Sequence, residues 1–404
     1  MRFPEKFIFG TSTSAFQIEG GSQTEWRGFR GQDGTFIGNA IDHYWQLKED
    51  LEYILYLGNG YRFSMDWSRL QKAPYSALDS KEVKHYKILF DSLKDNNKKV
   101  FLVLHHFANP LWMYNAGCWT SRESPYIFFD YAKKVLNIFG DYIDILNTFN
   151  EPNAYVNLAY LFRSFLPKKF NPVLRKIAFS NMARAHMLVY EYVKENYPKI
   201  ITGISQAHMI TETIGRYNLP GSIIKRFFDH IQHEPLHEYF LKSGKYADYI
   251  GCSYYGRIPI ERFPLLAYQE QGMKRLDELG IDHDNMWELY PEGIYAQIKF
   301  FSEKYAKPVI ICENGTCTDD DELRKVSLYN HLKYVKKAID DGMPVLGYFH
   351  WSTFDNFELA YGPSRRFGLT SVDFSSPKLE RKIKKSGHYY HNVMSSMSLK
   401  KLQD

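Results

Sequence analysis

The residues of this sequence best suited to chemistry are two glutamates, each placed where a short apolar run stops. Glu313 ends the run 309–312, which reads Val-Ile-Ile-Cys, and Glu151 follows the run 145–150, which reads Ile-Leu-Asn-Thr-Phe-Asn. Runs of this length, rich in β-branched residues, are typical of buried strands. A carboxylate that leaves a core strand is costly to bury without a partner. We therefore ask whether the two glutamates meet.

Two carboxyl groups on one rim form the pair that glycoside hydrolysis uses. One group donates a proton to the leaving oxygen, and the other attacks the sugar or activates water. Strand ends that are far apart in sequence converge only if the strands point the same way. The hypothesis therefore requires a parallel sheet.

Eight runs of the required kind recur along the chain, separated by segments with helical patterns. We expect the strands at 7–11, 61–64, 100–104, 145–150, 201–205, 249–253, 309–313 and 345–349. Each run is continuously apolar rather than alternating, as in a parallel sheet covered on both faces. This count predicts an α/β protein with one closed (β/α)₈ TIM barrel. No linker or composition shift divides the chain, so we expect a single domain over residues 1–404.

Side chains that could do chemistry gather just after these expected strands. In a (β/α)₈ barrel the carboxyl ends of the strands share one face, and that face carries the active site. The residues that follow this rule are Gln17, Arg62, His106, Asn150, Glu151, Tyr255, Glu313 and Trp351.

The charge and the hydropathy of the chain argue against other partners. The net charge of +5, from 51 basic and 46 acidic residues, is mild, and the densest basic run, 378–385, has no interleaved aromatic residues. We interpret that run as a solvated helix start rather than a nucleic-acid site. No stretch is long enough to span a membrane, and the charged N-terminus does not resemble a signal peptide. We expect neither nucleic acid nor a membrane as a partner, and the sequence carries no signal for an oligomeric state.

The cysteines and histidines give no good metal site. Cys118 and Cys252 lack metal-type spacing, and Cys312 and Cys317 form only a C-x₄-C pair, so we expect reduced thiols in a cytoplasmic protein. Residues 233–237 formally match the H-E-x-x-H zinc pattern, but that pattern needs an unbroken helix and its third residue is proline. We expect a surface helix there and no metal. The glycines at 28, 31 and 34 follow no strand, which indicates a loop rather than a dinucleotide cradle, and we expect no cofactor.

The sequence resembles glycoside hydrolase family 1, the β-glucosidase family of retaining glycosidases. The resemblance rests on an ordered series of motifs that spans almost the whole chain. The matching segments are 7–11, 17–20, 61–64, 67–69, 106–107, 117–119, 148–152, 254–255, 291–293, 313–315, 347–348, 351–352, 355–358 and 366–368.

The resemblance implies a role for each residue that matches the family pattern. Glu151 would be the acid/base and Glu313 the nucleophile, with Arg62 and Tyr255 supporting the nucleophile. The residues that would bind the substrate are Gln17, His106, Asn150, Trp351, Glu358 and Phe367.

The activity that the resemblance implies is that of a retaining exo-β-glycosidase acting on a small β-glycoside or a short oligosaccharide. Hydrolysis would proceed by double displacement through a glycosyl-enzyme intermediate, on β-glucosides first, with β-galactosides and β-fucosides as companion substrates. A carboxylate at Glu358 would repel a phosphate, which disfavours the 6-phospho-β-glycosidases of the family. The alternatives are such a phosphoglycosidase, a transglycosylase using the same site, and a catalytically inactive sugar-binding or sensing barrel.

Two departures from the family pattern bear on the substrate. Leu359 stands where the family usually has a tryptophan that contacts the sugar, and Ser253 stands where it usually has asparagine. We expect altered discrimination of the first sugar and an intact catalytic pair.

Overall fold

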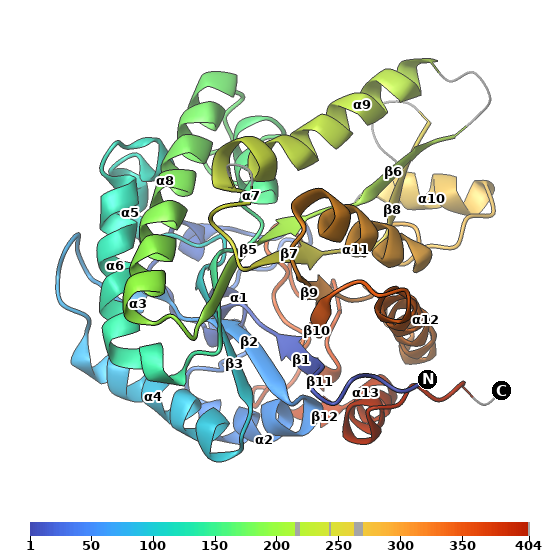
Figure 1. Cartoon of the computed structure of the whole chain (residues 1–404), viewed down its shortest axis with the longest axis horizontal. Helices are drawn as coiled ribbons and strands as arrows, with labels where there is room; N and C mark the ends of the chain where they lie inside the picture. The colour runs from blue at the N-terminus through green and yellow to red at the C-terminus, as the bar shows by residue number, and fades with distance from the viewer. Residues whose placement is uncertain (215–218, 242–243, 262–269, 403–404) are drawn as a thin grey trace.

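The computed structural model describes residues 1–214, 219–241, 244–261 and 270–402. Eight of its strands run parallel and close into a barrel in the order β1-β10-β9-β7-β5-β4-β3-β2 (Figure 1). The strands are β1 (Ile8–Ser12), β2 (Gly60–Ser64), β3 (Lys99–His105), β4 (Ile145–Phe149), β5 (Ile201–Ala207), β7 (Tyr249–Ser253), β9 (Val309–Asn314) and β10 (Val345–Trp351). The eight predicted strands and the (β/α)₈ barrel are confirmed.

Large aromatic side chains fill the barrel beneath the site. The ring of Phe101 on β3 lies 6.0 Å from that of Tyr249 on β7 and 5.0 Å from that of Phe349 on β10. These three strands are not neighbours, so their side chains meet in the interior. The guanidinium of Arg62 lies above this layer, 5.5 Å from the Phe101 ring.

Helices follow the barrel strands and pack around them (Figure 1). Asp79 and Asp320 cap two of these helices, since each side chain accepts hydrogen bonds from backbone N–H groups of the first turn, which otherwise lack partners. The helices of this ring are α2 (Leu47–Leu57), α4 (Ser80–Asp95), α6 (Ser124–Phe139), α8 (Pro172–Asn196), α11 (Glu292–Tyr305), α12 (Asp321–Asp340) and α13 (Lys385–Ser396).

Shorter elements lie in the loops between the strands and the ring helices. Helix α9 (Leu219–Glu234) reaches outward beside the small sheet of β6 and β8 (Figure 1). The remaining elements are α1 (Ala15–Glu19), α3 (Trp67–Leu70), α5 (Leu111–Asn115), α7 (Pro152–Tyr160), α10 (Glu270–Glu278), β6 (Ile210–Thr213), β8 (Arg257–Ile260), β11 (Thr370–Val372) and β12 (Arg381–Ile383), with 3₁₀ turns at Glu25–Gly28, Cys118–Thr120 and Gly140–Tyr142 and a π-helix at Pro235–Leu241.

The basic run 378–385 differs from its prediction. The run forms a turn and strand β12, which pairs antiparallel with β11, and helix α13 begins only at its last residue. In addition, two of its charged side chains form ion pairs and are largely buried. The Arg381 side chain is 3% exposed and lies 2.8 Å from Asp50, and the Lys384 ammonium lies 2.8 Å from Asp355. Buried carboxylates therefore hold this segment, which charge density alone does not reveal.

Two further predictions can be compared with the described residues. Cys118, Cys252, Cys312 and Cys317 are buried free thiols, which confirms their reduced state in this structure. Among the residues placed in the structure, no helix combines the length and the apolar character needed to cross a membrane.

Candidate active site

Glu313 lies at the carboxyl end of β9, as predicted, and two donors hold its side chain. The Arg62 guanidinium donates to one carboxylate oxygen at 2.7 Å, and the Tyr255 hydroxyl donates to the other at 2.7 Å. The Glu313 side chain is only 5% exposed. A carboxylate buried to this extent needs paired charge and hydrogen bonds, and both are present.

Arg62 connects four strand ends around this carboxylate. Its side chain is fully buried and also donates to Ser12 at 2.7 Å and to Asn150 at 2.5 Å. Burial lowers the pKa of Arg62, but the charge and hydrogen bond of Glu313, together with Cys312 and Tyr249, more than offset this effect, so the guanidinium stays charged. The result is a fixed cation at the bottom of the site.

Glu151 sits between β4 and α7 in a left-handed backbone conformation, with φ of 43° and ψ of 55°. Residues other than glycine adopt this conformation infrequently, and such strain tends to occur at functional sites. Burial, and then the negative charge of Glu313, raise the pKa of Glu151 well above 4.5. The two carboxyl groups therefore interact, and the site favours the protonated form of Glu151.

His106 and Asn150 form a hydrogen-bonded pair next to Arg62. Arg62 donates to the Asn150 Oδ1 atom, so the Asn150 amide must point its NH₂ toward His106 Nε2, which lies 3.0 Å away. The His106 Nε2 atom is then an acceptor and the proton resides on Nδ1. Burial and the charge of Arg62 hold the pKa of His106 well below 6.5, so the ring is neutral.

Gln17, Trp351 and Glu358 form a second group of side chains in the site. The Gln17 amide donates to the Glu358 carboxylate at 3.3 Å and to the Phe357 carbonyl at 3.0 Å. Trp351 ends β10, and its ring lies 5.6 Å from that of His106. Burial and the charge of Glu313 raise the pKa of Glu358 to about 7, although hydrogen bonds from Gln17 and Trp351 lower it. The structure thus brings an indole face together with several hydrogen-bonding groups.

Phe367 and the two residues that depart from the family pattern, Leu359 and Ser253, lie close to these residues in sequence or in space. The Phe367 ring packs edge-on against that of Tyr255, with 5.9 Å between the ring centres, so the two side chains are in direct contact. Leu359 is buried in the main hydrophobic core. Ser253 lies close enough to Glu151 to lower the pKa of that carboxyl, although its buried hydroxyl makes no hydrogen bond among the described residues.

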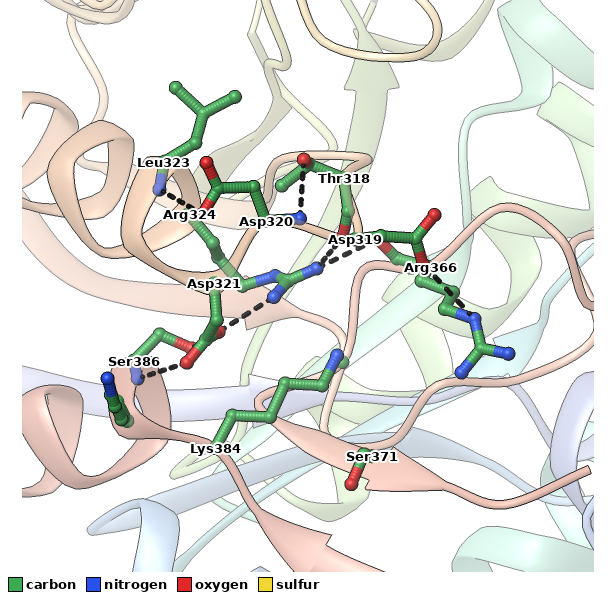
Figure 2. Close-up of polar contacts among 12 residues, drawn as sticks. Thr318, Asp319, Asp320, Asp321, Leu323, Arg324, Arg366, Ser371, Lys384 and Ser386 are labelled. Carbon is green, nitrogen blue, oxygen red and sulfur yellow. Dashed lines mark hydrogen bonds and ion pairs between the residues drawn. The ribbon is translucent and has the colours of Figure 1, made fainter.

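A buried arginine anchors the two loops that flank Glu313. Figure 2 shows Arg324 of α12 reaching the backbone carbonyls of Thr318 and Arg366, the latter at 3.2 Å. The same guanidinium pairs with Asp321 at 2.7 Å, and Asp321 accepts a hydrogen bond from the Ser386 hydroxyl at 2.6 Å. The loop after β9 and the loop that carries Phe367 are thereby tied to helices α12 and α13.

Gly315 allows the chain to pass close to β10 directly after Glu313. A Cβ atom at this position would lie 1.9 Å from the Trp351 carbonyl oxygen, which no side chain tolerates. The glycine of the Glu-Asn-Gly motif is therefore required by a close approach of backbones.

Two residues of the site were not among the predicted ones. The Ser12 hydroxyl accepts from Arg62, and the Ser205 hydroxyl donates to Asn150 at 2.9 Å. Both end or directly follow predicted strands, so the strand-end rule could have identified them. Serines are common in loops, and they carried no chemical signal of their own.

The zinc-like pattern divides between two elements. His233 belongs to α9 and lies 3.0 Å from His208, whereas His237 lies in the π-helix that begins at Pro235. In the described part of the chain, no group of three or more His, Cys, Asp or Glu side chains is arranged to hold a metal ion.

Comparisons with known proteins agree with this geometry. A family model described as glycosyl hydrolase family 1 matches residues 1–249 and 236–398. A β-glucosidase from Agrobacterium sp. is 29% identical over 456 residues, covering 98% of this chain and 95% of that protein. A β-galactosidase from Pyrococcus woesei is 28% identical, covering 100% of this chain and 99% of that protein. The solved structure of a family 1 β-glucosidase from Thermotoga maritima matches with a TM-score of 0.88 at 27% identity, covering 99% of both chains.

The fold, the paired glutamates and the family match define a class of enzyme. The protein is a glycoside hydrolase built on a (β/α)₈ barrel. The chain belongs to glycosyl hydrolase family 1.

Proposed function

We propose that this enzyme removes terminal β-linked sugars with net retention of configuration, taking β-glucosides first. The observation that carries the proposal is the unequal treatment of two interacting carboxyl groups. Glu313 is held by Arg62 and Tyr255, whereas burial and the charge of Glu313 favour the protonated form of Glu151. One site therefore contains a positioned nucleophile and a carboxyl group whose raised pKa suits a proton donor.

The first step forms a glycosyl-enzyme ester. The Glu313 carboxylate attacks the anomeric carbon while Glu151 gives its proton to the glycosidic oxygen, and the bond to the leaving group breaks. The Glu313 charge is consumed in the ester, so one of the two main influences that raise the pKa of Glu151 disappears. Glu151 then acts as a base on the incoming water. Attack of that water on the anomeric carbon breaks the ester, and Glu151 regains a proton.

Side chains near the two carboxyl groups would hold the sugar. His106, Glu358 and Gln17 offer polar groups, and Trp351 offers an apolar face. A sugar ring presents both hydroxyl groups and an apolar face, so this set suits it. The relatives named β-glucosidase and β-galactosidase support glucosides first and galactosides as companions.

An unphosphorylated sugar fits the charges near Glu358 better than a 6-phosphosugar does. The ionised carboxylate would repel a phosphate. The two arginines that follow in the sequence contact other groups. Arg365 donates to the Asn285 carbonyl at 2.9 Å, and Arg366 lies 3.4 Å from Asp319. Transglycosylation remains open to the same intermediate, because a sugar hydroxyl can replace water in the second step.

The test compares leaving groups in the Glu151→Ala variant. Hydrolysis of a phenyl β-glucoside, a poor leaving group, should fall by about 10²–10⁴-fold, whereas cleavage of a dinitrophenyl β-glucoside should fall far less because it needs little protonation. Glu212→Ala, exposed on β6, is the matched control and should change neither rate. The first-formed anomer, followed by NMR, should be β. Equal losses on both substrates would reject Glu151 as the acid.

An inactive sugar-binding barrel is the alternative from a different class. Wild-type protein that is folded, binds a monosaccharide and turns over no aryl β-glycoside would establish it. We further propose a cytoplasmic location and a single domain. Four buried free thiols support the location, and strands from β1 to β10 closing one barrel support the domain assignment.

A further inference from the structure

Helix α9 carries an apolar face that no other described element covers. Leu219, Ile223 and Phe227 recur at intervals of four residues and so lie along one side of the helix. Their exposed fractions are 70%, 62% and 47%. Single exposed apolar residues are common, but a stripe of three large ones on a projecting helix is not.

A second exposed stripe begins α8. Phe170, directly before the helix, is 67% exposed, and Val173 and Ile177 are 68% and 37% exposed. The two stripes belong to neighbouring segments, because the ring of Phe162 stacks on that of Phe228 of α9 at 5.5 Å.

An ion pair also joins the first turn of α8 to the end of α9. Arg175 of α8 lies 2.8 Å from Glu234 at the end of α9. We call the two stripes, together with the exposed cations Arg163, Lys169, Lys176 and Arg226, the α8–α9 surface.

The charge of this surface is strongly one-sided. From residue 152 to residue 190 the chain has six Lys or Arg residues and no Asp or Glu. The acidic groups of α9 are neutralised within the fold, since Asp229 pairs with Lys225 at 2.7 Å and Glu234 pairs with Arg175. Among the described residues, none of the four exposed cations of the surface forms an ion pair.

The surface lies on the side of the barrel where the strands end. Helix α7 begins directly after Glu151, and α8 runs back from that rim. Asn153 of α7 donates to the carbonyl of Ala207, at the end of β5, at 2.7 Å, and to the carbonyl of Gln232 in α9 at 3.4 Å. Helices α7 and α9 are neighbours in the fold. The apolar stripes therefore lie on the same side as the candidate active site.

We propose that the α8–α9 surface binds the surface of an anionic lipid bilayer. Apolar side chains flanked by lysine and arginine are the features of helices that lie in the membrane interface. A second copy of the chain fits less well, because a twofold contact through this surface would place its cations against the same cations. The sequence led us to expect no membrane partner, but the exposure of these apolar side chains is visible only in the fold.

The test is sedimentation of the full-length protein with lipid vesicles. Vesicles of phosphatidylcholine with about one third phosphatidylserine should carry the protein down at low salt, and vesicles of phosphatidylcholine alone should not. Salt of about 0.5 M should release it, because it screens the attraction. Loss of two cations should weaken binding by about 25-fold or more, at about fivefold for each.

Two double variants on the α8–α9 surface are compared with two matched double variants elsewhere on the protein. Lys169→Glu with Lys176→Glu should abolish sedimentation, whereas Lys81→Glu with Lys333→Glu, exposed on α4 and α12, should leave it within a few-fold. Ile223→Ser with Phe227→Ser should weaken it by at least about tenfold. Ile138→Ser with Val326→Ser, both 43% exposed elsewhere, should not. Circular dichroism and hydrolysis of a soluble aryl β-glucoside verify that each variant is folded.

Three results would overturn the proposal. The first is a wild-type protein that stays in solution with anionic vesicles. The second is an equal loss of sedimentation in the control variants. The third is a dimer, seen by analytical ultracentrifugation, that the Ile223 and Phe227 substitutions dissociate while no vesicle binding is found, which would assign the surface to a second copy of the chain.

Discussion

The pair formed by Arg62 and Glu313 should be worth several kilocalories per mole, and Arg62→Met tests this. The guanidinium is fully buried, lies 2.7 Å from the carboxylate and also donates to Ser12 and Asn150. Methionine keeps much of the length but removes the charge and every donor. Breaking a buried pair on one side costs about 3–5 kcal/mol, because the remaining charge is left without a partner.

The size of the effect can be converted to a melting temperature. A chain of 404 residues has an unfolding entropy of about 0.85 kcal/mol/K, so this loss lowers Tm by about 4–6 °C. Urea unfolding should show a lower midpoint with an unchanged slope. Turnover of aryl β-glucosides should fall at least 10²-fold, because Glu313 loses its main positioning contact.

A double-mutant cycle isolates the pair from the rest of the network. Glu313→Gln alone leaves Arg62 buried without a counter-charge, whereas the double variant Arg62→Met with Glu313→Gln removes both charges. The double variant should therefore be less destabilised than the sum of the single variants by at least about 2 kcal/mol. Strictly additive losses would refute the claim that these two side chains stabilise each other.

Three further predictions concern residues beside the pair. Ser253→Ala removes a hydroxyl group that lowers the pKa of Glu151, so the alkaline limb of the kcat/KM profile should move to higher pH; a shift to lower pH would contradict this. The pKa of Glu358 is raised from 4.5 to about 7, so the native state binds the extra proton and wild-type stability falls as pH rises through this window. In Glu358→Gln that fall should be smaller by up to about 3 kcal/mol in urea unfolding between these pH values, and parallel curves would refute it. Gly315→Ala should reduce kcat by about 10²-fold, because its Cβ would strike the Trp351 carbonyl, whereas Gly28→Ala, with open space around it, should not.

The barrel could be predicted because its signal is local. Each of the eight strands is a short, continuously apolar run, and burial on both faces of a parallel sheet imposes that pattern directly on the sequence. The rim residues followed from the same rule, since Glu313 and Arg62 lie in strands whose ends were already expected. The structure places them 2.7 Å apart.

Two features could not be predicted, because they depend on contacts between residues that are far apart in the sequence. The basic run 378–385 folds around Asp50 and Asp355, which are far away along the chain. Its charge density suggested a solvated helix start, whereas most of the run forms a turn and strand β12 and helix α13 begins only at the last residue. The exposed stripe of α9 has the same residue types as a buried one. Periodicity shows that such a face exists, and only the fold shows that no other described element covers it.

The closure of the barrel by β1 and β10 has a consequence for how the protein is made. Arg62 and Glu313 are 251 residues apart, and Ser12 pairs with Trp351 at the other end of the chain. At about 5–20 residues per second, the ribosome completes Arg62 about 13–50 s before its counter-ion. During that time the nascent chain holds a cation meant for the interior and an unclosed sheet edge. We expect this long exposure to make the newborn chain dependent on chaperones until its last strand emerges.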